Sequence, residues 1–233
     1  MTFEVSNPTN NRLGIRAVIL DFGEVLCRTP SPENIQKISA IFKLDPRTFL
    51  PNYLRGRASY DRGDVQPSEY WNAFAEDAGV EIDDPTIEQL RQMDLDLWSR
   101  IDDEMIAWLE QIHSAGFKTA ILSNMPTDMA DHVRRTYQWI DYFDHHIFSG
   151  EVRSVKPEPE IYEHCIAALK VQPSEALFID DRDENLEQAR AIGFRTIRYQ
   201  SVPQLRAELQ TLGFTILPAS PNPSKLGQRQ PRL

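Results

Sequence analysis

The residues best suited to catalysis in this chain lie where short apolar runs end. Asp21 follows the run at 17–20 and precedes Gly23, a pattern that predicts a buried strand, a carboxylate at its end and a sharp turn. Asp180 and Asp181 end a second apolar run much further along the chain. Because open parallel sheets bind ligands at the C-terminal ends of their strands, we expect these three carboxylates to share one site.

The chemistry that suits these acids is phosphoryl transfer. A carboxylate such as Asp21 can act as a nucleophile and form an aspartyl-phosphate. Adjacent carboxylates such as Asp180 and Asp181 repel each other, and a hard divalent cation such as Mg²⁺ relieves that repulsion while bridging to a phosphate. Each acid also has a structural interpretation, as a polar strand end or as a solvated acidic turn ahead of a helix. Taken together, the three acids favour a metal site.

Three further residues are candidates for binding a phosphate group. Ser123 and Asn124 follow an apolar run and offer a hydroxyl, an amide and backbone N–H groups. Lys156, which precedes Pro157, is able to neutralise phosphate oxygens and nearby carboxylates. Taken singly, a Ser-Asn pair is more often a turn and helix cap, and a lysine more often lies on the surface.

The elements that must position these residues alternate along the chain. Apolar runs predict strands at 17–20, 118–122, 146–148, 176–180 and 195–199. Helical patterns occupy the intervals, at 102–115, 126–138, 157–170, 183–192 and 203–212. This alternation predicts the α/β class, with a parallel sheet that is covered by helices on both faces.

The interval 28–100 has no convincing strand pattern. It predicts four helices, at 33–42, 46–57, 67–78 and 85–99. We therefore expect a separate helical domain at 28–100, inserted into an α/β core made of 15–27 and 101–215. Residues 1–14 are expected to form a flexible N-terminus, and the proline-rich segment 216–233 a disordered tail.

Composition excludes several classes of protein. The 233 residues carry a formal net charge of −10, with a pI of about 5.0 and no run of Lys or Arg, which argues against nucleic-acid and anionic-membrane surfaces. Cys27 and Cys165 lie far apart and form no metal or redox motif. With no apolar run of membrane length and no signal-peptide pattern at 1–14, we expect a cytoplasmic protein, either a monomer or a homodimer.

In the order and setting of its motifs the chain resembles the haloacid dehalogenase (HAD) superfamily, over roughly residues 15–200. The motifs are Asp21 at a strand end, Ser123-Asn124 at a strand end, Lys156-Pro157 before a helix, and Asp180-Asp181 at a strand end. The insert resembles the C1 cap of the branch that contains small-molecule phosphatases. The resemblance implies a Rossmann-like parallel-sheet core with an inserted helical C1 cap.

The resemblance also implies a role for each residue of the metal site. Asp21 is the nucleophile and a metal ligand, Gly23 contributes its carbonyl oxygen to Mg²⁺, and Asp180 and Asp181 complete the ligand set. Asn185 matches a position that often supports such a site.

On the substrate side, Ser123 and Asn124 are implied to hold the phosphoryl group, and Lys156 to steady it. The loop at 59–64, between the second and third predicted cap helices, is expected to select the substrate through Arg62, whose guanidinium suits a polar metabolite. The alternative is an ordinary helix–helix turn with solvated charges.

The chain departs from the phosphatase pattern at position 23. Phosphatases of this superfamily usually carry a second Asp two residues after the nucleophile, as general acid and then base, whereas this chain has Gly23. A positioned acid contributes about 10²–10⁴-fold to the rate. Its absence is tolerable for a leaving group that departs without protonation, such as an anomeric or acyl phosphate. Otherwise another group must substitute, and Glu24 is the nearest candidate.

The function predicted from the sequence is a Mg²⁺-dependent phosphatase that acts on small phosphorylated metabolites, with sugar phosphates favoured. Two alternatives stay open. One is a non-catalytic binding or regulatory protein that keeps the fold without the acid at position 23. The other is a metal-independent haloacid dehalogenase, against which the pair Asp180-Asp181 argues, because a dehalogenase binds no cation there.

Overall fold

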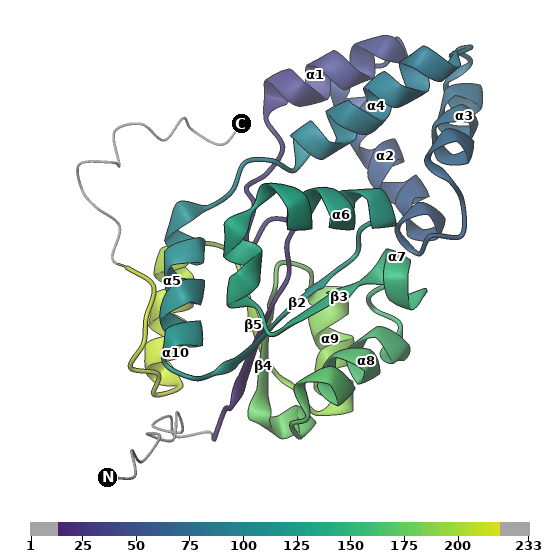
Figure 1. The fold of residues 1–233 in the computed structure, drawn as a ribbon. Helices are drawn as coiled ribbons and strands as arrows, with labels where there is room; N and C mark the ends of the chain where they lie inside the picture. Colours follow the sequence, from purple (N-terminus) through teal and green to yellow (C-terminus); the bar gives the residue numbers. More distant parts are fainter. Residues whose placement is uncertain (1–13, 220–233) are drawn as a thin grey trace.

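The computed structural model describes residues 14–219, and its core is a five-stranded sheet in the order β3-β2-β1-β4-β5 (Figure 1). All four neighbouring pairs of strands are parallel. The strands are β1 (Ala17–Leu20), β2 (Lys118–Ser123), β3 (His145–Phe148), β4 (Ala176–Asp180) and β5 (Arg195–Arg198). The predicted α/β class and parallel sheet are confirmed.

The register of the central strands brings the predicted site residues to one edge. Leu20 at the end of β1 pairs with Ile121 of β2 on one side and with Ile179 of β4 on the other. The backbone N–H of Asp21 donates to the carbonyl of Ile179, 3.0 Å away. Asp21 therefore lies level with the end of β4, where Asp180 stands.

Helices cover both faces of the sheet, as Figure 1 shows. On one face, Val18 and Leu20 of β1 share a buried apolar cluster with side chains of α5 (Asp103–Ser114), α6 (Thr127–Thr136) and α10 (Val202–Thr211). On the other, Ala17 and Ile19 pack with α8 (Pro159–Leu169) and α9 (Asp183–Ile192). Alternate residues of one strand thus serve two cores, which explains why its sequence is apolar throughout.

The insert after β1 consists of α1 (Pro32–Ile41), α2 (Pro46–Asp61), α3 (Pro67–Ala78) and α4 (Asp84–Leu97). Ser31, Asp45 and Asp83 cap the N-termini of α1, α2 and α4, and each cap is followed by a proline in the first turn. These helices enclose an apolar cluster of their own, rich in aromatic rings. In Figure 1 they lie beyond the end of the sheet to which β1 leads, so they cover the predicted site.

The two segments that join the insert to the sheet domain run side by side. Cys27 and Ile101 form an isolated antiparallel bridge, and the N–H of Arg28 donates to the carbonyl of Arg100 at 2.7 Å. The paired segments hold the cap close to the nucleophile loop, since Asp21 is only six residues before Cys27.

Most element boundaries differ from the predicted ones by one or two residues, and larger or structurally informative differences occur at α2, α6 and α8. α2 continues to Asp61, four residues further than expected. α6 ends at Thr136, and the 3₁₀ turn η1 (Gln138–Tyr142) follows it. α8 begins at Pro159 rather than 157, and a one-turn helix, α7 (Ser149–Val152), precedes it without a sequence signal. Apart from α7, the predicted helix is present in each case, and the turn geometry at its end decides the boundary.

Most of the two terminal segments, predicted to be flexible at 1–14 and disordered at 216–233, lies outside the described residues. Within the described part, the carbonyl of Ile216 accepts a hydrogen bond from Nε1 of Trp108 at 3.2 Å. Among residues 14–219, no helix combines the length and the apolar character that crossing a membrane requires.

Candidate active site

Lys156 links the ends of β1 and β4. Its Nζ lies 2.8 Å from Oδ1 of Asp21 and 2.7 Å from Oδ2 of Asp180. All three side chains are buried, with residue exposures of 5% for Lys156, 6% for Asp21 and 0% for Asp180. The three side chains therefore lie in direct contact, and Lys156 is a buried counter-ion rather than a surface residue.

The charges at this site are strongly coupled. Burial raises the pKa of Asp21, and the neighbouring Asp180 raises it further, whereas Lys156 and a hydrogen bond from Ser123 act in the opposite direction. Burial disfavours the charged form of Lys156, but the carboxylates of Asp180 and Asp21 outweigh it and raise the pKa of this lysine. The ammonium therefore stays protonated between the two acids.

Asp181 supplies the third carboxylate. Burial, together with the charges of Asp21 and Asp180, raises the pKa of Asp181 to about 7. One oxygen from each of the three aspartates can be chosen so that all lie within 4.8 Å of one another. Three carboxylates against the single ammonium of Lys156 leave an excess of negative charge, and oxygen donors in this arrangement fit a hard divalent cation.

Asn185 supports the metal-side carboxylate, in line with its expected place. Its Nδ2 donates to both oxygens of Asp180, at 3.0 Å each. The N–H of Arg182, at the start of α9, donates to Oδ1 of Asp180 at 2.9 Å. With Lys156 on Oδ2, four hydrogen bonds fix the plane of this carboxylate.

Ser123 and Asn124 both lie at the end of β2, but they make different contacts. Ser123 is buried and forms a side-chain hydrogen bond with Asp21. The amide of Asn124 pairs with the backbone of Lys156, donating to its carbonyl at 2.9 Å and accepting from its N–H at 2.7 Å. Asn124 therefore positions the lysine segment, and direct phosphate binding by its side chain stays a prediction.

Gly23 and Glu24, in the loop after Asp21, differ in backbone conformation. The left-handed backbone conformation in this loop belongs to Glu24, at φ +60°, and not to Gly23. The carboxylate of Glu24 accepts a hydrogen bond from Oγ1 of Thr29 at 2.7 Å, so it is already held beside the loop. A role for Glu24 as replacement acid, and for the carbonyl of Gly23 as metal ligand, stays a prediction.

Arg62 lies just after α2 and forms ion pairs on both sides. It contacts Asp64 of its own loop and Glu158, which precedes α8 in the core. Arg153 adds a contact across the same gap, donating to the carbonyl of Gly63 at 2.7 Å. These bonds tie the cap loop to the core, which is a structural use of Arg62 beside its predicted role in substrate selection.

Several residues near the site carry no signal in the sequence. Trp98, directly after α4, lies against Gly23, and its Nε1 donates to the hydroxyl of Tyr53 at 3.0 Å. Arg91 of α4 donates to Asp128 at the start of α6, at 3.2 Å. These contacts join positions far apart in the chain, so no local spacing could have predicted them.

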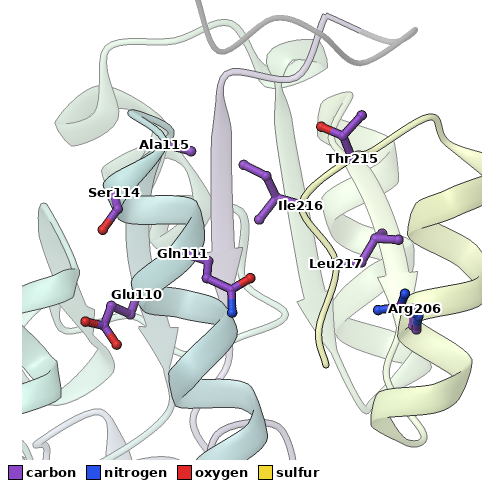
Figure 2. Close-up of a pocket in the computed structure, with 8 residues that line it drawn as sticks. All are labelled: Glu110, Gln111, Ser114, Ala115, Arg206, Thr215, Ile216 and Leu217. Atoms are coloured by element: carbon purple, nitrogen blue, oxygen red, sulfur yellow. The ribbon is translucent and has the colours of Figure 1, made fainter. Parts of the chain in front are cut away.

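An open hollow of about 710 Å³ lies elsewhere in the molecule. Figure 2 shows its lining, which comes from the last turns of α5, Arg206 of α10 and the segment 215–217. α5 ends where the chain turns toward the start of β2, so this hollow lies at the end of the sheet remote from Asp21. The candidate site is therefore the cluster beneath the cap.

A family model described as haloacid dehalogenase-like hydrolase matches residues 15–193, which is more than half of the chain. The chain belongs to the haloacid dehalogenase-like hydrolases. The family assignment made from the four motifs is confirmed.

Two curated relatives and one solved structure illustrate the likeness. Bifunctional epoxide hydrolase 2 of Rattus norvegicus is 32% identical over 127 residues, which are 53% of this chain and 23% of that protein. D-ribitol-5-phosphate phosphatase of Bacteroides thetaiotaomicron is 24% identical over 206 residues, covering 85% of this chain and 98% of that enzyme. A HAD family enzyme of the same bacterium, in complex with magnesium and inorganic phosphate, has a TM-score of 0.65 at 22% identity, covering 80% and 94%.

The chain thus covers less than a quarter of the rat relative and nearly all of the bacterial one. The structural match at this level of identity shows a common fold.

Proposed function

We propose that this protein is a Mg²⁺-dependent phosphatase of small phosphorylated metabolites, working through an aspartyl-phosphate on Asp21. The observation that carries the proposal is the buried cluster in which Lys156 lies between Asp21 and Asp180, with Asp181 completing three convergent carboxylates. A buried acid with a lysine counter-ion and a cation site beside it has the parts that phosphoryl transfer needs.

Asp21 is the nucleophile in this proposal. Its Oδ1 is held by the N–H of Phe22 at 2.7 Å and by Lys156, which fix the direction of the carboxylate. A carboxylate oxygen attacks phosphorus, a P–O bond to Asp21 forms, and the bond to the leaving oxygen breaks. Water then attacks the phosphorus, which releases inorganic phosphate and restores the carboxylate.

The other residues stabilise the charge of the transferring group. Lys156 donates to the phosphoryl oxygens, and Asn124 keeps that lysine in place through its backbone. Mg²⁺, held by Asp21, Asp180 and Asp181, would supply the positive charge that neutralises the phosphoryl oxygens. Asn185 keeps Asp180 aligned for this ligand set.

The absence of an acid at position 23 limits which leaving groups the proposed enzyme can accept. Gly23 stands at the position of the usual acid, so the proposal favours esters whose leaving group departs without a proton, and among metabolites an anomeric sugar phosphate fits. The similarity to a relative named D-ribitol-5-phosphate phosphatase supports a small phosphorylated substrate. The neighbour solved with magnesium and inorganic phosphate supports the cation.

A phosphate-release assay with and without Mg²⁺ tests the proposal. We expect turnover that requires Mg²⁺, is abolished in Asp21→Asn and falls strongly in Asp181→Asn. Asp183→Asn is the matched control, because Asp183 is an exposed acid two residues further on that pairs with Arg198. Metal-independent release of halide from a 2-haloacid would favour a dehalogenase, and phosphate binding without any turnover would favour a regulatory protein.

A further inference from the structure

The space beside Gly23 is occupied by a residue of the cap. A Cβ built on Gly23 would lie 3.5 Å from Cζ3 and 3.9 Å from Cε3 of Trp98, which is ordinary van der Waals contact. The backbone there does not require glycine, because the positive φ belongs to Glu24. The direction in which a side chain would leave position 23 therefore points at the six-membered ring of the Trp98 indole.

Trp98 is held in this place by a hydrogen-bonded chain. It directly follows α4 and is half-buried. Its Nε1 donates to the hydroxyl of Tyr53 at 3.0 Å, and that hydroxyl in turn accepts from Arg57 at 2.6 Å and contacts Asp94. The orientation of the indole is thus set from inside the cap.

The hydrogen bonds to Trp98 lead back to a buried ion-pair network around Arg57. Arg57 forms ion pairs with Asp94 at 2.8 Å and with Asp61 at 2.9 Å, and its guanidinium lies 4.8 Å from the ring centre of Tyr53. All these residues are buried. A buried network with this many partners has one satisfied arrangement, because any displacement leaves a charge without a partner. The network therefore holds the indole ring of Trp98 in one orientation beside Gly23.

We propose that Trp98 is a specificity-determining residue, whose ring contacts the leaving group above Gly23 and selects phosphorylated substrates whose leaving group carries a ring with an apolar face. The inference rests on the proposed phosphatase function, in which position 23 faces the leaving group. Glycine at 23 and the indole over it belong together, since the ring takes the space toward which an acid at 23 would project. An aromatic surface favours a flat or cyclic group over a short chain.

Two acyl phosphates separate this ring contact from the chemistry. Benzoyl phosphate and acetyl phosphate have carboxylate leaving groups of similar basicity, and one of them carries a ring. With Mg²⁺ present, Trp98→Ala is expected to lower kcat/KM for benzoyl phosphate by roughly three- to tenfold, the range of one aromatic contact, and to leave acetyl phosphate unchanged. Inhibition by inorganic phosphate stays unchanged, because phosphate binds at Lys156.

Two further variants keep the test independent of folding. Trp98→Leu fills most of the indole's volume without a ring, and it is expected to show the same selective loss with the thermal midpoint nearer to that of the wild type. Tyr53→Phe removes the hydroxyl that orients the indole and is expected to give a smaller loss, again confined to benzoyl phosphate. Gln92→Ala, on the exposed side of α4, is the control and leaves kcat/KM for both acyl phosphates unchanged.

Equal losses of kcat/KM on both acyl phosphates, or no loss on either, in folded Trp98→Ala and Trp98→Leu would overturn the role of Trp98 while leaving the proposed phosphatase function intact. If the wild type released phosphate from neither acyl phosphate in the presence of Mg²⁺, the proposed function itself would fail, and the selection role with it.

Discussion

Replacing Lys156 with Met removes the positive charge that lies between the buried carboxylates of Asp21 and Asp180. The Nζ–O distances are 2.8 Å to Asp21 and 2.7 Å to Asp180. At an effective dielectric constant of about 20, each contact corresponds to roughly 6 kcal/mol of Coulomb attraction, most of which offsets the cost of burying the charges. Removing one partner of a buried pair costs about 3–5 kcal/mol, because the acids stay buried without compensation.

Lys37→Met is the matched control. Lys37 and Glu33 are also 2.8 Å apart, but their side chains are 59% and 76% exposed. An exposed pair contributes less than about 1 kcal/mol. Urea unfolding without Mg²⁺ should therefore give a loss of about 3–5 kcal/mol for Lys156→Met and a small one for Lys37→Met. Circular dichroism on the two variants and the wild type measures both.

The pH and metal dependence sharpen the prediction. In Lys156→Met the pKa of Asp21, already raised by burial, rises further, so protonation of this acid relieves the penalty, and the stability loss shrinks as the pH is lowered toward 4. Mg²⁺ supplies the missing positive charge and should stabilise this variant more than it stabilises the wild type. A loss no larger than that of Lys37→Met, or equal stabilisation of variant and wild type by Mg²⁺, would refute the electrostatic account of the site.

Three more predictions follow from the cap and the nucleophile loop. Burial raises the pKa of Asp61 from 3.8 to about 6, so the folded state binds this proton more tightly and the unfolding free energy falls as pH rises from 4 to 6. Asp61→Asn should remove about 3 kcal/mol of this fall, measured by urea unfolding at each pH, and an unchanged pH dependence contradicts it. Gly23→Asp should fold, since its Cβ has ordinary contacts. Combined with Trp98→Ala, which clears the space toward which the new acid projects, it should speed alkyl phosphates by up to about 10²–10⁴-fold relative to acyl phosphates, and an unaltered ratio of the two rates in the double variant argues against the missing acid. Arg62→Ala should raise KM for the best metabolite without changing kcat for a generic ester, and equal changes on both would restrict Arg62 to tying the cap to the core.

The sheet and the main site were predictable because their signals are local. An apolar run that ends in Asp21 or Asp180 indicates a buried parallel strand with a polar group at its end. Parallel strands then place their C-terminal ends at one edge, so the meeting of these acids follows from topology alone. The position of Lys156 between Asp21 and Asp180, and its burial, come from the structure, because a lysine before a proline gives no signal for burial.

What the sequence could not predict depends on long-range packing. Trp98 and Gly23 are 75 residues apart in numbering, and their contact exists only because the cap returns to the core beside the nucleophile loop. The same holds for the pairing of Asn124 with the backbone of Lys156. The spacing of Tyr53, Arg57 and Asp61 at four-residue intervals is a signal for one face of a helix, yet burial of their charges depends on Asp94 of another helix.

The covalent step at Asp21 is the centre of the proposal, and chemical trapping tests it most directly. The enzyme is mixed with substrate and Mg²⁺, quenched during turnover and reduced with borohydride, which converts an acyl phosphate on aspartate into homoserine. Peptide mass spectrometry then identifies the modified position. The account predicts homoserine at position 21 only when both substrate and Mg²⁺ are present; phosphate release with unmodified Asp21, or homoserine at another aspartate, would contradict it.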